Sequence, residues 1–246
     1  MLPKIFKPLN EYDLIRLGKD NDGGYLVEKE SLAEAKSLIS FGIAFDWSFE
    51  KHFLKLKNCP IHCYDPFIKY SNIKKFSRKS LIDLFKIKNL LNKRLMKETI
   101  NKIFLYNDYK KFFSKEVIHY ESSIGVGNNK IDFSETIKKI NSYPTFLKID
   151  IEGSEYRILD DLINYQDKIS GLVIEFHNVD LHKDIISNFI KKFSLSLCHI
   201  HGQNPLGSNF LDSNNDPIQV EMTFSKSKNI LSTKPKIPHP LDQPAD

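Results

Sequence analysis

Residues 146–155 read FLKIDIEGSE, and this stretch decides the fold. Its apolar residues alternate as in a β-strand as far as Ile151, and apolar residues at helical spacing follow from Tyr156. Asp150 and Glu152 lie between the two patterns. Ligands of open α/β sheets bind beyond the carboxyl ends of the strands. We therefore expect these carboxylates at the edge of a binding crevice or, as the alternative, simply at the start of the next helix.

The composition predicts a single globular domain over residues 1–246. Hydrophobic residues make up 41% and charged residues 27% of the chain, which suits one α/β domain with a large core. The sequence shows neither a secretory leader nor an apolar run long enough to cross a bilayer, so a cytoplasmic location is expected. Cys59, Cys63 and Cys198 have neither a disulfide-framework nor a thiolate-zinc spacing.

The charge balance argues against a nucleic-acid partner. The formal net charge is +5, and arginine occurs only at positions 16, 78, 94 and 157. Proteins that read bases usually use more arginine, because its guanidinium bonds base edges bidentately. The mild positive charge instead favours an anionic acceptor or surface.

Two turns near the N-terminus contain glycine. The segment 16–27, RLGKDNDGGYLV, places Asp22, Gly23 and Gly24 in the densest turn signal of the chain, and a short strand is expected at 25–27. This turn is either a simple hairpin or a place where backbone N–H groups approach a ligand carboxylate. The segment 41–50, FGIAFDWSFE, follows a predicted strand but lacks the glycine spacing of a dinucleotide fingerprint, so a pyrophosphate cofactor is disfavoured.

Further acidic residues follow the next predicted strands. The strand at 61–65 ends on Asp65. A carboxylate at this position can accept hydrogen bonds from both hydroxyls of a ribose; alternatively, Asp65 simply begins an Asp-Pro loop. A strand is expected at 117–123, and another at 172–176 contains Glu175 and is followed by His177. Strands at 195–201 and 218–224 are expected to pair antiparallel and to close the sheet, ahead of a Pro-rich tail at 229–246.

The segment 67–115 interrupts the alternation of strands and helices. Apolar residues recur at helical spacing, and most charged residues among them are basic, which predicts a basic helical insert. Four interpretations of this insert are open. It is a helical cap with a solvated basic face, a lid over an anionic acceptor, an oligomer contact, or an interfacial helix on anionic lipid. The basic residues considered are Lys69, Lys74, Lys75, Arg78, Lys79, Lys86, Lys88, Lys93, Arg94 and Lys97.

Several motifs resemble those of one enzyme family. FGIAFDWSFE, YDPF, FLKIDIEGSE, VIEFH and HIHGQN look like the FkbM-type branch of S-adenosylmethionine-dependent methyltransferases, and RLGKDNDGGYLV is similar to an element upstream of it in some bacterial members. The resemblance covers most of the chain apart from the insert and the tail. It implies a Rossmann-like α/β fold: a mixed, mostly parallel sheet with a C-terminal antiparallel hairpin and helices on both faces. Ala44 departs from the pattern, because many relatives have glycine there.

The resemblance also implies the residues that contact S-adenosylmethionine. By matching position, Gly42 and Asp46 hold its amino acid portion, Asp65 holds the ribose, and Ser123 lies near the adenine. Acidic residues suit this cofactor because its sulfonium and ammonium groups are cations. The candidate cofactor residues are Asp22, Gly23, Gly24, Gly42, Asp46, Asp65, Ser123 and Asp150.

Methyl transfer to a hydroxyl requires a proton acceptor. His177 is the first candidate for the general base, because a neutral imidazole titrates near working pH; a structural hydrogen-bonding role is the alternative. Asp150, Glu175 and His201 are the other catalytic candidates. The same groups could ligate Mg²⁺ or Mn²⁺, but their spacing is not diagnostic and no metal ligand is assigned.

The expected function is S-adenosylmethionine-dependent O-methylation of a sugar or of a capsular or lipopolysaccharide precursor. This acceptor class comes from the resemblance. One alternative is methylation of a small phosphorylated metabolite, in which the insert lysines contact the acceptor. Outside the transferases, a nicotinamide-dependent oxidoreductase is disfavoured by the glycine pattern, and a non-catalytic cofactor-binding or scaffold module is the remaining alternative.

Overall fold

The centre of the protein is a seven-stranded mixed sheet. The computed structural model describes residues 2–20, 23–85, 92–125, 130–202 and 211–243. The strand order is β10-β11-β9-β8-β3-β4-β5, and every neighbouring pair is parallel except the two that involve β11. The predicted fold class, with its antiparallel closing hairpin, is therefore confirmed. The strands are β3 (Ser37–Phe41), β4 (Ile61–Tyr64), β5 (Val117–Tyr120), β8 (Thr145–Ile149), β9 (Ile169–Phe176), β10 (Ser196–Gly202) and β11 (Val220–Ser225).

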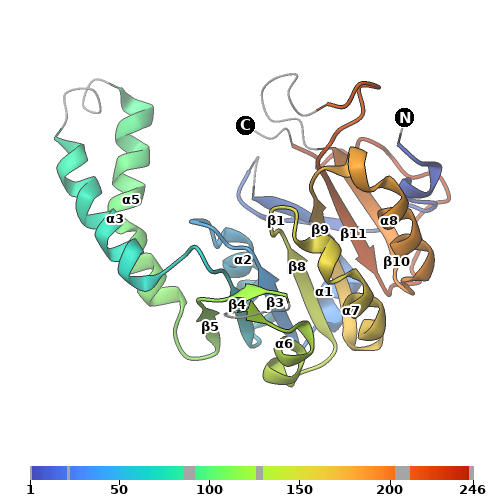
Figure 1. Ribbon diagram of the computed structural model, residues 1–246, viewed down its shortest axis with the longest axis horizontal. Coiled ribbons are helices and arrows are strands. Elements are labelled where there is room, and N and C mark those ends of the chain that lie inside the picture. Colours follow the sequence, from blue (N-terminus) through green and yellow to red (C-terminus); the bar gives the residue numbers. More distant parts are fainter. Residues whose placement is uncertain (1, 21–22, 86–91, 126–129, 203–210, 244–246) are drawn as a thin grey trace.

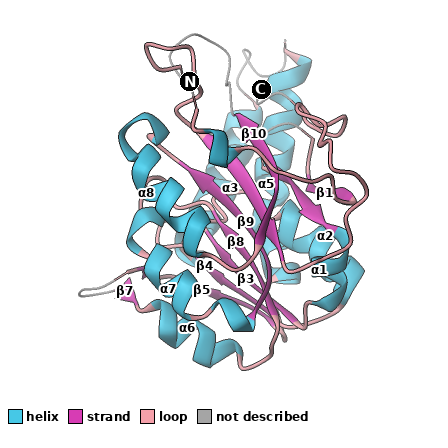
Figure 2. Cartoon of the chain, turned by 90° about the vertical axis from the view of Figure 1, so that its right-hand side faces the viewer, coloured by secondary structure: helices cyan, strands magenta, loops and turns pink. Residues whose placement is uncertain are grey.

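Helices cover both faces of this sheet (Figure 2). Every residue of β3, β8 and β9 is buried, which explains why these strands are almost continuously apolar in the sequence. One face packs against α6 (Phe133–Ile140), α7 (Leu159–Asn164) and α8 (Val179–Lys192), and the other against α1 (Lys29–Glu34) and α2 (Ser48–Lys57). Each face has its own hydrophobic core, so the carboxyl ends of the strands are held rigidly from both sides.

A small N-terminal hairpin lies against the second face. Strands β1 (Leu14–Gly18) and β2 (Gly24–Glu28) pair antiparallel, as the turn pattern predicted, with Gly18 opposite Gly24. The hairpin is tied to the closing strand β11, because the Thr223 hydroxyl donates to the Leu26 carbonyl at 2.5 Å. This contact places β2 beside the central strands.

Two long helices project from the sheet (Figure 1). They are α3 (Tyr70–Leu84) and α5 (Lys93–Phe112), and they lie in the segment 67–115, where a helical insert was expected. We call the described residues 70–85 and 92–112 the arm. The Ser77 hydroxyl of α3 donates to the Lys102 carbonyl of α5 at 2.9 Å, so the two helices pack side by side. None of the helices in the described part of the chain is long and apolar enough to cross a membrane.

Short elements complete the chain. The strand expected at 117–123 ends at Tyr120, because Ser123 pairs with Lys130 in a separate two-stranded sheet. In the C-terminal tail, Ser232 pairs with Glu11 near the N-terminus. The short elements are β6 (Ser123–Ile124), β7 (Lys130–Ile131), η1 (Lys4–Phe6), η2 (Glu155–Arg157) and η3 (Gln166–Lys168).

Candidate active site

A cavity opens at the carboxyl ends of β3, β4 and β8. Its volume is about 490 Å³, within the range of pockets for small molecules and cofactors. It lies where the strand order reverses, the usual ligand position in a doubly wound sheet. Four of the candidate cofactor residues line it: Gly42, Asp65, Ser123 and Asp150.

Gly42 is required by a close backbone approach. It has φ +77°, and a Cβ at this position would lie 1.6 Å from the carbonyl oxygen of Asp150. The buried Lys148 ammonium donates to the Gly42 carbonyl at 2.6 Å. Burial lowers the pKa of Lys148, but the charges of Asp150, Glu50 and Glu175 outweigh burial and raise it. A buried cation therefore contacts Gly42 of the cavity lining, and sequence reasoning did not identify it.

The carboxylate of Asp65 holds together two loops of the cavity wall. One oxygen accepts from the backbone N–H groups of Ile43 at 3.0 Å and Ala44 at 2.9 Å. The other accepts from Phe67 at 2.8 Å and Ile68 at 3.1 Å. Asp65 is 4% exposed. Asp65 lines the cavity, and its ribose contact stays a prediction; its four bonds give it a structural role that the sequence did not suggest.

Other candidate cofactor residues lie beside the cavity lining. One Asp46 oxygen accepts from the Ser48 N–H at the start of α2, at 3.0 Å, and the other pairs with Lys19 at 3.2 Å. A Cβ on Gly23 would lie 2.8 Å from that Asp46 carboxylate, so the glycine turn packs directly on Asp46. Gly24 forms the neighbouring end of β2, and Asp22 lies outside the described residues.

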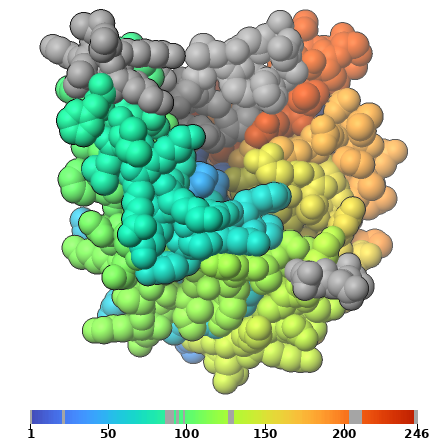
Figure 3. All heavy atoms as spheres, turned by 60° about the vertical axis from the view of Figure 1, so that its left-hand side comes forward, coloured from blue at the N-terminus to red at the C-terminus, as the bar shows by residue number. Residues whose placement is uncertain are grey.

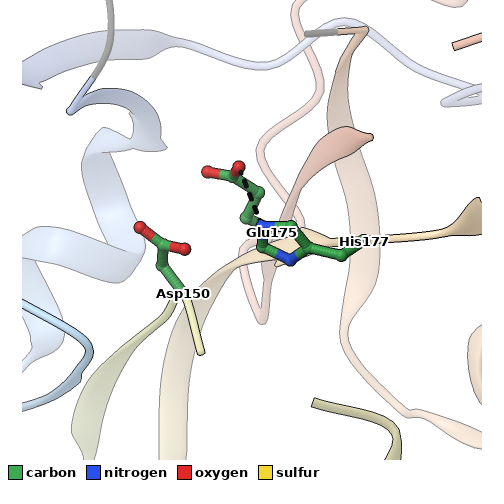
Figure 4. Close-up of side chains that lie close together, drawn as sticks. All are labelled: Asp150, Glu175 and His177. Carbon is green, nitrogen blue, oxygen red and sulfur yellow. Dashed lines mark ion pairs between the residues drawn. The ribbon is translucent and has the colours of Figure 1, made fainter. Parts of the chain in front are cut away.

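Asp150, Glu175 and His177 form a cluster next to the cavity (Figure 4). Each offers one potential ligand atom, and these atoms all lie within 4.8 Å of one another. The Tyr25 hydroxyl lies 3.0 Å from Asp150 Oδ2 and 3.2 Å from Glu175 Oε2, and His177 Nε2 lies 3.5 Å from Glu175 Oε1. Gln219 also donates to Glu175. Because Asp150 also lines the cavity, these titratable groups adjoin the space for a ligand.

The surroundings raise the pKa values of both Glu175 and His177. Burial and the nearby Asp150 charge raise the pKa of Glu175 to about 7. Burial lowers the pKa of His177, but the hydrogen bond and charge of Glu155 outweigh it and raise this pKa to about 9. Near neutral pH His177 is therefore mainly a cation, whereas Glu175 is poised between its two forms. This balance favours Glu175 over His177 as the proton acceptor.

Glu155 orients His177, and the sequence did not reveal this role. Its fully buried carboxylate accepts from the His177 backbone N–H at 2.7 Å and lies 3.2 Å from ring Nδ1. The other oxygen accepts from the Gly153 N–H at 2.9 Å. Glu155 and Lys148 both belong to the stretch 146–155, and charged residues in such an apolar stretch were the available signal.

In the part of the chain that the structure describes, His201 lies outside the cluster of Asp150, Glu175 and His177. It lies on β10, with Nδ1 3.6 Å from Asp242 Oδ2, and His199 Nε2 of the same strand lies 2.8 Å from Asp242 Oδ1. Burial raises the pKa of Asp242, but its bonds to both histidines outweigh burial and hold this pKa well below its ordinary value. The observed role of His201 is thus to help hold the tail on the sheet.

Comparisons with known proteins identify the enzyme class. Residues 98–195 match the model of the methyltransferase FkbM domain, and no curated protein matches the chain. Similar solved structures include an rRNA methylase from Streptococcus thermophilus (10% identity, TM-score 0.40, 80% of this chain and 92% of that one). They also include precorrin-6y C5,15-methyltransferase from Geobacter metallireducens (12% identity, TM-score 0.39, 80% of this chain and 85% of that one). A third is an O-methyltransferase family protein from Burkholderia thailandensis (9% identity, TM-score 0.37, 80% of this chain and 52% of that one). Residues 98–195 thus match the methyltransferase FkbM family that the sequence motifs resemble.

Proposed function

We propose that the protein is a cytoplasmic S-adenosylmethionine-dependent O-methyltransferase. Its acceptor would be a hydroxyl of a sugar or of a capsular or lipopolysaccharide precursor. The observation that carries the proposal is the buried carboxyl of Glu175, whose pKa is raised to about 7 beside the cavity. A hydroxyl must lose its proton as it is methylated, and a base is most effective when its pKa lies near the working pH.

The cavity suits the cofactor in size and chemistry. Gly42 lines the cavity where its backbone packs on the Asp150 carbonyl, and Asp150 contributes a carboxylate that favours a cationic group. Phe45, Phe67 and Ile124 give the wall apolar surface for a flat ring, next to Ser123. When bound there, S-adenosylmethionine supplies the methyl group. Asp65 supports this site by holding two of its loops, whether or not it also contacts the ribose.

The residues of the cluster have distinct roles in this proposal. Glu175 takes the proton of the acceptor hydroxyl, and the Tyr25 hydroxyl donates toward Glu175 and Asp150. The His177 cation, held in place by Glu155, balances the charge of the ionised carboxylates. An alternative, in which neutral His177 is itself the base, requires a higher working pH.

The decisive experiment is an acceptor screen. Purified protein with labelled S-adenosylmethionine is offered nucleotide-activated sugars and phosphorylated metabolites, with and without a chelator and added Mg²⁺ or Mn²⁺. We expect label on a sugar hydroxyl, and a loss of kcat on the order of 10²- to 10⁴-fold in Glu175→Gln with unchanged cofactor affinity. Turnover confined to phosphorylated metabolites would support the alternative acceptor. Cofactor binding without turnover of any acceptor would support a non-catalytic module.

The chelator arm of this screen tests a cation at the same cluster. Two carboxylates and an imidazole, from Asp150, Glu175 and His177, are donors that suit Mn²⁺ and, through their oxygens, Mg²⁺. Activity that is lost with the chelator and restored by either metal would assign the cluster a metal. Unchanged activity would leave it as a proton-transfer site.

A further inference from the structure

The arm exposes a mixed basic and apolar surface that the proposed chemistry does not use. On α3 and its C-cap Phe85, the exposed residues Lys75, Arg78, Ile82 and Phe85 follow one another at helical spacing and so share one face. Ile82 is 71% and Phe85 is 77% exposed. The basic residues therefore lie nearer the body of the enzyme, and the apolar ones nearer the far end of the helix.

Folding of the arm does not account for these exposed side chains. The two helices pack through another side of α3, where Ile73 is fully buried. There the Ser77 hydroxyl donates to Lys102 and accepts from the Tyr106 N–H at 3.1 Å. Large apolar side chains that are clustered, exposed and unnecessary for packing commonly mark an interaction surface.

The second helix of the arm repeats this mixture. Lys97, Ile100, Phe104 and Lys111 recur at helical spacing along α5, and all four are exposed, Phe104 by 60%. The charge of α3 is also one-sided. Its basic residues are Lys74, Lys75, Arg78 and Lys79, against the single acid Asp83.

We propose that the arm docks the enzyme on an anionic lipid surface. Cations beside exposed apolar side chains are the composition of an interfacial helix, because the cations attract acidic headgroups while the apolar groups enter the acyl boundary. A soluble polyanion would bind the cations but leave Ile82 and Phe85 in water. The arm of a second copy would carry the same positive charge and be repelled.

The arm is also connected to the cavity. At its base, the Phe76 ring stacks on Phe45, with centroids 5.1 Å apart, and Phe45 lines the cavity together with Phe67. Figure 3 shows the arm, teal to green, on the same face as the segment that leads into it from β4. Docking would thus bring the cavity close to acceptors carried on the lipid surface. This last step rests on the proposed function, whereas lipid binding itself does not.

Vesicle flotation tests the proposal directly. The full-length protein is mixed with vesicles of phosphatidylcholine alone or with phosphatidylglycerol, in the absence of cofactor and acceptor. We expect binding only to the anionic vesicles, weakening as salt is raised. Arg78→Gln with Lys79→Gln should lower the partition coefficient roughly 10- to 30-fold and flatten its salt dependence. Ile82→Ser with Phe85→Ser should lower it at least about tenfold.

Matched controls lie outside the arm. Leu9→Ser removes an 81% exposed apolar side chain, and Lys191→Gln with Lys192→Gln removes two exposed charges of α8. These variants should bind like the unaltered protein, and thermal melts by circular dichroism check that all variants are folded. Equal binding by arm and control variants would overturn the proposal. It would also be overturned by arm-dependent binding of polyphosphate, or by arm-dependent dimerisation in ultracentrifugation, without vesicle binding.

Discussion

Glu175 and His177 are neighbours, with Oε1 of one 3.5 Å from Nε2 of the other, and both have raised pKa values. The pKa of Glu175 is about 7, because burial and Asp150 disfavour its anion, and that of His177 is about 9, because Glu155 outweighs burial. If ionised Glu175 is the base, kcat/KM should rise as pH increases through about 7. It should fall as pH increases through about 9, where His177 loses its charge. A pH–rate profile with a stable acceptor measures both limbs.

Two variants show which residue causes each limb of the pH–rate profile. Glu175→Gln should abolish the limb near 7, and His177→Gln should abolish the fall near 9 while lowering turnover less. The two roles would be reversed if activity instead rose through about pH 9 and this rise disappeared in His177→Gln. In that case neutral His177, the first candidate from the sequence, would be the base.

Ala44 is strained by the turn that it occupies. Its φ is +44°, a left-handed conformation that costs a residue with a Cβ roughly 1 kcal/mol. Ala44→Gly removes this strain but gives the unfolded chain more freedom, so we expect a net gain of about 0.5 kcal/mol in the free energy of unfolding. Ala33→Gly, at an exposed position of helix α1, is the matched control and should lose about 1 kcal/mol. Urea unfolding of both variants gives the comparison, and equal losses would refute strain at Ala44.

At the scale of elements, Asp65 joins the loops that follow β3 and β4. Asp65→Asn replaces one of its acceptor oxygens with a donor, so two of the four backbone N–H groups lose their partner. We expect a loss of about 1 to 3 kcal/mol in unfolding free energy and a weaker cofactor affinity of similar size. Denaturant unfolding and calorimetry with S-adenosylhomocysteine measure these quantities.

Comparing the loss of stability with the loss of cofactor affinity separates the structural role of Asp65 from the predicted ribose contact. Asp132→Ala removes a cap from α6, where the carboxylate accepts from the Ser134 N–H at 2.7 Å, and should reduce stability without changing cofactor affinity. A loss of stability in Asp65→Asn with unchanged affinity would exclude the predicted ribose contact. A loss of affinity larger than the loss of stability would support it.

Element positions were largely predictable because the central strands are buried on both faces. The runs at 61–65 and 172–176, in which apolar residues predominate, correspond to β4 and β9, because strands between two helix layers are buried on both faces. The strand at 117–123 was predicted too long. Ser123 leaves the main sheet to pair with Lys130, and a local pattern of residues does not reveal which distant segment a strand will pair with.

At the scale of the whole molecule, the site is assembled from segments far apart in the chain. Tyr25 lies 125 residues before Asp150 and 150 before Glu175, yet its hydroxyl reaches both carboxylates. The sequence placed a short strand at Tyr25 correctly, and it placed the acidic residues at strand ends. It could not show that the N-terminal hairpin packs across the sheet, because that packing depends on contacts such as Thr223 with Leu26. The proton chemistry of the cluster was therefore the least predictable feature.

Tyr25→Phe tests this long-range contact. Tyr25 is 1% exposed, and without its hydroxyl the buried Glu175 carboxylate and the partly buried Asp150 carboxylate lose a donor. We expect the free energy of unfolding to fall by about 1 to 3 kcal/mol. The Glu175 anion should also become less favourable, so the activity limb near pH 7 should move to higher pH.

A second buried tyrosine provides the control for stability. Tyr64 is also 1% exposed, but its hydroxyl has no hydrogen-bond partner among the described residues, so Tyr64→Phe should be neutral or slightly stabilising. A double-mutant cycle with Glu175→Gln then isolates the contact. The combined loss of Tyr25→Phe and Glu175→Gln should be smaller than the sum of the single losses, because each variant removes the same hydrogen bond. Strict additivity, together with an unmoved pH limb, would show that the N-terminal hairpin supports the fold without tuning the Asp150 and Glu175 carboxylates.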